Sequence, residues 1–108
     1  MKFKMNDRYW IIKEVGQEEF WKDEEKTKDG YYFGRTCFDI QEIWLDKDIS
    51  IEQKRKTLYH ELTHCYRGMY IGFNSLDGQD EEIWCDIVEN SHDMIHRIVE
   101  EYFRNDKN

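Results

Sequence analysis

The strongest constraint on the fold of this chain is a helical pattern that continues without a break from residue 50 to about residue 70. Ser50 and Gln53 stand three residues apart, as in a capping box, and Gly72 follows as a helix stop. Four apolar residues recur at helical spacing on one face: Leu58, Leu62, Cys65 and Met69. The pattern therefore predicts a long helix that buries this face against the rest of the domain.

The same helix carries the motif His60-Glu61-Leu62-Thr63-His64, and its two histidines fall on the face nearly opposite the apolar stripe. Residues four apart on a helix lie side by side, so His60 and His64 can bind one metal ion from a single rigid element. Glu61 is placed to take a proton from metal-bound water and pass it to a leaving amine. The motif predicts one zinc ion, with His60 and His64 as ligands and Glu61 as the catalytic residue. The alternative is an ordinary helix with two exposed histidines.

A hydrolytic zinc site needs a third protein ligand, and a second helical pattern from about residue 80 to residue 103 offers one. Glu82 lies near its start, on a face next to the apolar stripe of that helix, and we predict Glu82 as the third ligand. Glu81 and Asp86 remain alternatives. Asp86 is also a candidate to orient a ligand histidine. The alternative is that these acidic side chains only stabilise the N-terminus of the helix through its dipole.

Strand signals lie before the motif helix. Residues 3–15 predict at least one strand, from Arg8 to Val15, and residues 31–45 predict two, with a turn near Phe38 and a possible bulge at Gly34. Residues 16–30 predict a short helical turn and then a loop. We expect a single α+β domain over residues 1–108. Its small sheet, of about three strands and mostly antiparallel, packs on the motif helix and on a second long C-terminal helix.

The formal net charge of −8 argues against nucleic acid as the main partner. The short basic run at residues 54–56 is either a solvated start of the helix or a patch that attracts an acidic substrate. No apolar run is long enough for an export signal or a membrane span. Cys37, Cys65 and Cys85 are an odd number without paired spacing, so we expect reduced thiols in a cytoplasmic protein.

Several other polar residues are candidates to stabilise an oxyanion, although no spacing singles one out and a structural role is the favoured interpretation for each: Tyr59, Tyr66, Arg67, Tyr70 and His92. His92 and His96 form a second pair four residues apart, without a glutamate between them. A second metal site there is the weaker hypothesis. A role for His92 beside the first site is the stronger one.

Three segments together resemble the ImmA/IrrE-type metallopeptidases, in particular short relatives from phages and mobile elements: GRTCFDIQEIWLD, TLYHELTHCYRG and EEIWCDIVE. Ile43 to Leu45 correspond to the strand end before the family's motif helix. Residues 82–86 correspond to its Glu-x-x-Ala-Asp element, with Cys85 in place of alanine. The resemblance covers about residues 31–90, and residues 1–30 carry no matching motif.

The resemblance implies a minimal zincin-like fold, with zinc bound by His60, His64 and Glu82 and with Glu61 as general base. Better-known members cleave repressor proteins and usually carry further segments beside the protease core. A repressor is therefore a candidate substrate. Because this sequence is close to the bare core, a homodimer or another partner is a candidate to complete the substrate cleft.

Three functions follow from these observations. The first is a zinc-dependent endopeptidase of an intracellular protein, in which Glu61 activates zinc-bound water. The second is a metal-binding regulatory or interaction module with little or no peptidase activity, because a small chain has little surface for a deep specificity pocket. The third is a domain without catalytic function whose histidines are fortuitous.

Overall fold

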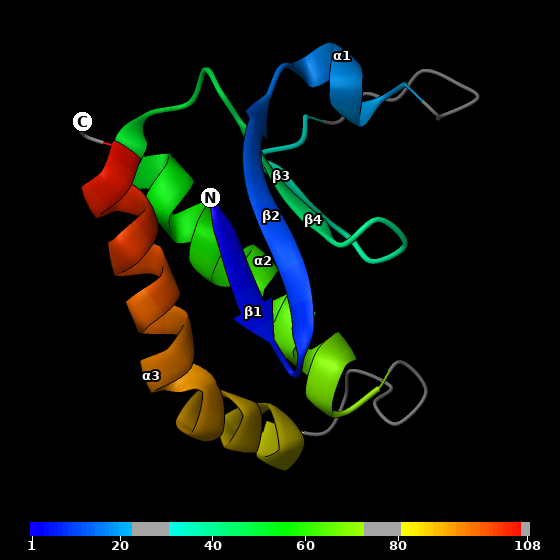
Figure 1. The fold of residues 1–108 in the computed structure, drawn as a ribbon, viewed down its shortest axis with the longest axis vertical. Coiled ribbons are helices and arrows are strands. Elements are labelled where there is room, and N and C mark those ends of the chain that lie inside the picture. Colours follow the sequence, from blue (N-terminus) through cyan, green and yellow to red (C-terminus); the bar gives the residue numbers. More distant parts are fainter. Residues whose placement is uncertain (23–30, 73–80, 107–108) are drawn as a thin grey trace.

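The computed structural model describes residues 1–22, 31–72 and 81–106, of which 81–83 and 105–106 are described by their backbone alone. The elements in chain order are β1 (Lys2–Met5), β2 (Arg8–Val15), α1 (Gln17–Phe20), β3 (Gly34–Cys37), β4 (Glu42–Asp46), α2 (Ile51–Tyr70) and α3 (Glu81–Asp106). Figure 1 shows that α2 crosses behind the sheet and that α3 runs along the same side. The fold is α+β, as predicted.

The sheet has four strands in the order β1-β2-β4-β3, so the prediction of about three strands is wrong. The pairs β1–β2 and β3–β4 are antiparallel, whereas β2 and β4 are parallel. The strand that was not predicted is β1. It joins β2 through Asn6 and Asp7, which adopt positive φ angles of 50° and 65°. Asn and Asp tolerate this left-handed conformation and so support a two-residue hairpin turn.

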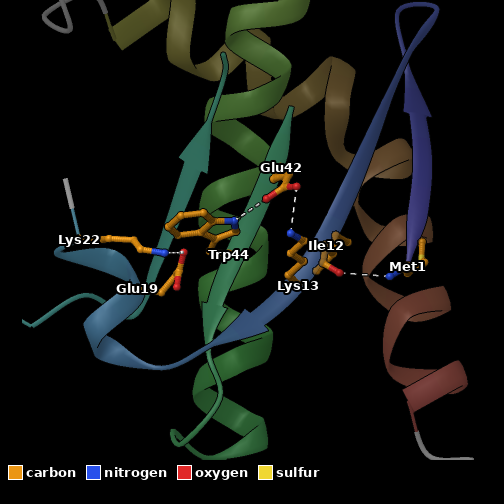
Figure 2. Close-up of polar contacts among 7 residues, drawn as sticks. All are labelled: Met1, Ile12, Lys13, Glu19, Lys22, Glu42 and Trp44. Carbon is orange, nitrogen blue, oxygen red and sulfur yellow. Dashed lines mark hydrogen bonds and ion pairs between the residues drawn. The ribbon is translucent and has the colours of Figure 1, made fainter. Parts of the chain in front are cut away.

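The two faces of the sheet differ in polarity. The side chains buried against the helices alternate along the strands: Phe3, Met5, Trp10, Ile12, Ile43 and Leu45. Figure 2 shows part of the opposite face, where Lys13 pairs with Glu42 at 3.1 Å and the Trp44 indole donates to Glu42 at 2.8 Å. In the same view the N-terminal amine of Met1 donates to the Ile12 carbonyl at 3.1 Å, which extends the hairpin.

The sequence predicted most element boundaries well. β2 covers the predicted residues, and α1 lies where a helical turn was expected. The loop expected to end at Gly30 lies outside the described residues. The bulge expected at Gly34 is absent, because Gly34 to Cys37 pair one for one with Leu45 to Glu42.

Both long helices complete the core. α2 begins at the predicted capping box, because the Ser50 hydroxyl accepts a hydrogen bond from the Gln53 amide at 3.1 Å. Gly72 follows the end of the helix with a φ of 105°. α3 continues a little beyond the predicted end at residue 103. Tyr102 and Phe103 are buried near this end. None of the helices in the described part of the chain has an apolar stretch long enough to cross a membrane.

Candidate functional site

The rotation of α2 decides which of its residues face the solvent. Leu58, Leu62 and Cys65 are completely buried against the sheet and α3. His60 and His64 consequently lie on the exposed side of the helix. The core stripe and the histidine pair thus occupy different faces, as predicted.

The two histidine side chains converge. Their Nε2 atoms lie 3.2 Å apart, and the ring centroids are 4.8 Å apart. Two nitrogens bound to one tetrahedral zinc at about 2.0–2.1 Å stand roughly 3.3 Å apart, from the geometry of a tetrahedron. His60 and His64 are therefore spaced to share a metal ion without a change in the helix.

The protonation of His64 also suits a metal ligand. Partial desolvation of its ring lowers the pKa of His64 below the ordinary value, although the negative charge of Glu61 opposes this shift. The neighbouring His60 and Arg67 lower it further. Because imidazole binds metal in its neutral form, a lowered pKa reduces competition from protons.

Glu61 lies on the side of α2 that faces β3. It is only 7% exposed, and the Thr36 hydroxyl on β3 contacts its Oε1 at 2.7 Å and its carbonyl oxygen at 3.0 Å. Within the described residues no hydrogen bond to Oε2 is found. The sequence analysis did not identify Thr36. Strand alternation from Gly34 would have placed Thr36 on the face toward the helix.

Gly34 allows β3 to approach α2 closely enough for this contact. A Cβ atom at Gly34 would lie 2.5 Å from Thr57 Cγ2, 3.0 Å from the Trp44 carbonyl oxygen and 3.1 Å from Glu61 Cγ. The first distance is shorter than a normal non-bonded contact. The absence of a side chain at Gly34, and not a bulge, is therefore what the site requires.

A cavity of about 360 Å³ opens beside Glu61. One wall is the segment of residues 31–33 that leads into β3. The other wall is the first half of α2, through Gln53, Lys56 and Thr57, and the lining continues to His60 and Glu61. The candidate base and one candidate ligand thus border a space into which a substrate group could enter.

The predicted third ligand, Glu82, belongs to the first turn of α3. The backbone of Glu81 and Glu82 starts α3, but their side chains lie outside the described residues. Asp86 is exposed and contacts neither His60 nor His64 among the hydrogen bonds of the described part. In that part no group of three or more His, Cys, Asp or Glu side chains could hold a metal ion. Of the predicted site residues, the structure brings the His60 and His64 rings together, and Glu61 lines the same cavity as His60.

The second histidine pair lies elsewhere, on α3. The rings of His92 and His96 stack at 6.0 Å, and His96 Nδ1 shares a 2.6 Å hydrogen bond with the Tyr59 hydroxyl. This contact joins α2 to α3. Tyr70 accepts a hydrogen bond from the Asn6 amide at 2.9 Å, and its ring packs on Tyr66 at 4.7 Å. The contacts of Tyr59, Tyr66 and Tyr70 thus fit the structural roles expected for them.

Comparisons of the chain with protein-family models, with curated proteins and with solved structures find no match. What the chain does is therefore inferred from the residues and geometry of the site.

Proposed function

We propose that this chain is a zinc-dependent metalloendopeptidase of the ImmA/IrrE type that hydrolyses peptide bonds of an intracellular protein. One observation carries the proposal: the Nε2 atoms of His60 and His64 converge to 3.2 Å beside a glutamate that is held in place by β3. A fortuitous pair of histidines on a helix would not require Glu61 to be buried and hydrogen-bonded at the same site.

Each residue of the motif then has a separate role. His60 and His64 hold the zinc ion, and Glu82 is the proposed third ligand. Zinc supplies Lewis-acid chemistry at such a site, because it lowers the pKa of water and polarises a peptide carbonyl. Glu61 takes the proton from the attacking water and delivers it to the leaving amine, while Thr36 holds the other carboxylate oxygen of Glu61.

The sheet provides a place for an extended substrate. β3 is an edge strand of the sheet, and among the described strands it pairs with β4 alone. An extended peptide can add to such an edge through main-chain hydrogen bonds. The peptide would then pass close to Glu61, because Thr36 on β3 contacts this residue directly.

Metal analysis of purified variants tests the site. We expect zinc in wild type and in Glu61→Gln, and its loss in His60→Ala. His92→Ala removes an exposed histidine from α3 and should retain zinc, which makes it a matched control. Zinc retained in His60→Ala would refute the assignment of the ligands.

Cleavage of a peptide library tests the reaction. Loss of a general base costs roughly 10²- to 10⁴-fold in rate, so Glu61→Gln should be almost inactive while it keeps its zinc. If wild type and Glu61→Gln cut the library equally, the peptidase proposal fails. Zinc binding without any cleavage would instead favour a metal-binding regulatory module.

A further inference from the structure

The cavity beside Glu61 has a wall that is fixed in place before any substrate binds. The side chain of Gln17 forms two hydrogen bonds with the backbone of Tyr32, donating to its carbonyl at 2.5 Å and accepting from its amide at 3.3 Å. Gln17 also donates to the buried carboxylate of Asp46 at 3.0 Å. The Tyr31 hydroxyl donates to the same carboxylate oxygen. These contacts tie Tyr31 and Tyr32 to α1 and to the end of β4.

This wall presents aromatic surface to the solvent. Tyr31 and Phe33 are 56% and 45% exposed, and their rings meet edge to face at 5.5 Å. Tyr32 lies between them in sequence, and its ring packs on Phe20 at 5.4 Å and on Trp21 at 4.6 Å. Exposed aromatic surface that borders a preformed cavity is characteristic of a ligand-binding site.

The opposite wall carries a positive charge. Two cations of the basic run at residues 54–56 are engaged in ion pairs: Lys54 with Glu14 at 2.8 Å, and Arg55 with Glu100. Lys56 is exposed, lines the cavity and forms no ion pair within the described residues. The positive charge of Lys56 thus lies at the cavity of a chain whose formal net charge is −8.

We propose that this cavity binds an aromatic side chain of the peptide substrate, next to the scissile bond, and that Lys56 pairs with a carboxylate of an adjacent substrate residue. The inference rests on the proposed peptidase function and specifies its substrate class. The volume of about 360 Å³ is near the lower limit for small-molecule sites and suits one large side chain. Since His60 and Glu61 belong to the lining, the bound side chain lies beside the reacting bond.

Binding measurements on the catalytically impaired Glu61→Gln chain test this assignment without cleavage. Three fluorescein-labelled peptides of equal length would carry Phe-Asp, Ala-Asp or Phe-Lys at their centre, and their affinity would be measured by fluorescence anisotropy. We expect the Phe-Asp peptide to bind at least about tenfold more tightly than either of the others. The Ala-Asp peptide lacks the aromatic ring that would fill the cavity, and the Phe-Lys peptide lacks the carboxylate that would pair with Lys56.

Two further substitutions in the same chain locate the effect. Lys56→Glu should reverse the preference, so that the Phe-Lys peptide binds more tightly than the Phe-Asp peptide. Lys2→Glu makes the same change in net charge on β1, the strand at the far edge of the sheet, and should leave the preference unchanged. Gln53→Phe fills the cavity from the helix surface and should lower the affinity for Phe-Asp by about tenfold.

The possible outcomes distinguish a failure of the cavity assignment from a failure of the peptidase proposal. Equal affinity for the Phe-Asp and Ala-Asp peptides, or an unchanged charge preference in Lys56→Glu, would overturn the cavity assignment even if wild type cleaves peptides. Selective binding of Phe-Asp without cleavage of that peptide by wild type would support the pocket as a peptide-binding site and overturn the peptidase proposal.

Discussion

Glu61 has an environment unlike that of its two histidine neighbours. A buried carboxylate is costly unless it receives hydrogen bonds, and Thr36 supplies one from β3. This contact fixes the direction of the carboxylate relative to the histidine pair, whereas His60 and His64 lie on the exposed side of α2. Proton transfer is sensitive to such orientation, so Thr36 is a positioning residue for the proposed reaction.

Thr36→Val should lower the kcat of peptide cleavage by about tenfold, with little change in KM. A hydrogen bond to a charged group contributes about 1.5–3 kcal/mol, and tenfold in rate corresponds to about 1.4 kcal/mol. Steady-state kinetics on a defined peptide would measure the effect, and zinc content should stay at the wild-type level.

Thr36→Ser is the matched control, because it keeps the hydroxyl group and removes only a methyl group. Its kcat should return close to that of wild type. Equal losses of kcat in the serine and valine variants would show that the methyl group, and not the hydrogen bond, accounts for the effect.

At the scale of elements, local signals predicted most of the helix boundaries and nonlocal contacts were missed. The start of α2 followed from Ser50 and Gln53, three residues apart, and the histidine pair followed from helical periodicity. The contact between Thr36 and Glu61 joins positions 25 apart, so no local pattern reveals it. β1 was missed because its hairpin turn depends on the left-handed conformation of Asn6 and Asp7.

The close packing of β3 on α2 makes Gly34 sensitive to substitution. Gly34→Ala would place a methyl group 2.5 Å from Thr57 Cγ2 and 3.0 Å from a main-chain oxygen of β4, so the strand and the helix must move apart. We expect the free energy of unfolding to fall by about 1–3 kcal/mol, as in other overpacked sites. Urea denaturation would measure this loss.

Gly16→Ala is the control for the glycine change itself. The atoms nearest to a Cβ atom there belong to the Glu18 carboxylate, the end of a flexible side chain that can rotate away. Its free energy of unfolding should remain within about 0.5 kcal/mol of wild type, as for most surface substitutions. An unchanged denaturation midpoint for Gly34→Ala would mean that β3 and α2 do not need this close approach.

At the scale of the whole molecule, Asp46 connects parts of the chain that are distant in sequence. Its completely buried carboxylate, at the end of β4, accepts from the side chains of Gln17 and Tyr31 and from the Asp48 amide at 2.9 Å. Asp46 therefore joins the sheet to α1 and to the wall of the cavity. Loss of its charge should weaken the fold and the cavity together.

The pH dependence of stability tests this role. Burial alone would raise the pKa of Asp46, but the hydrogen bonds from Tyr31, the Asp48 amide and Gln17, together with the charge of Lys54, outweigh it and lower the pKa. A carboxyl group with a lowered pKa in the folded state stabilises the fold above its unfolded pKa, about 3.9. That contribution is lost as the pH falls through the lower folded value.

Asp46→Asn should therefore reduce the free energy of unfolding at pH 7 by about 1–3 kcal/mol, because its single amide oxygen cannot replace both carboxylate oxygens: one accepts from Tyr31 and Gln17, and the other accepts from the Asp48 amide. The difference from wild type should shrink as the pH falls below about 4, where Asp46 of the unfolded chain takes up a proton, and it should be smallest below the lowered pKa of the folded carboxyl group. Urea denaturation at pH 7 and pH 3 would measure both values.

Asp48→Asn is the control, because it removes an exposed carboxylate and keeps the amide that donates to Asp46. It should show neither effect. A deficit in Asp46→Asn that is equal at both pH values would mean that the charge of Asp46 does not stabilise the fold.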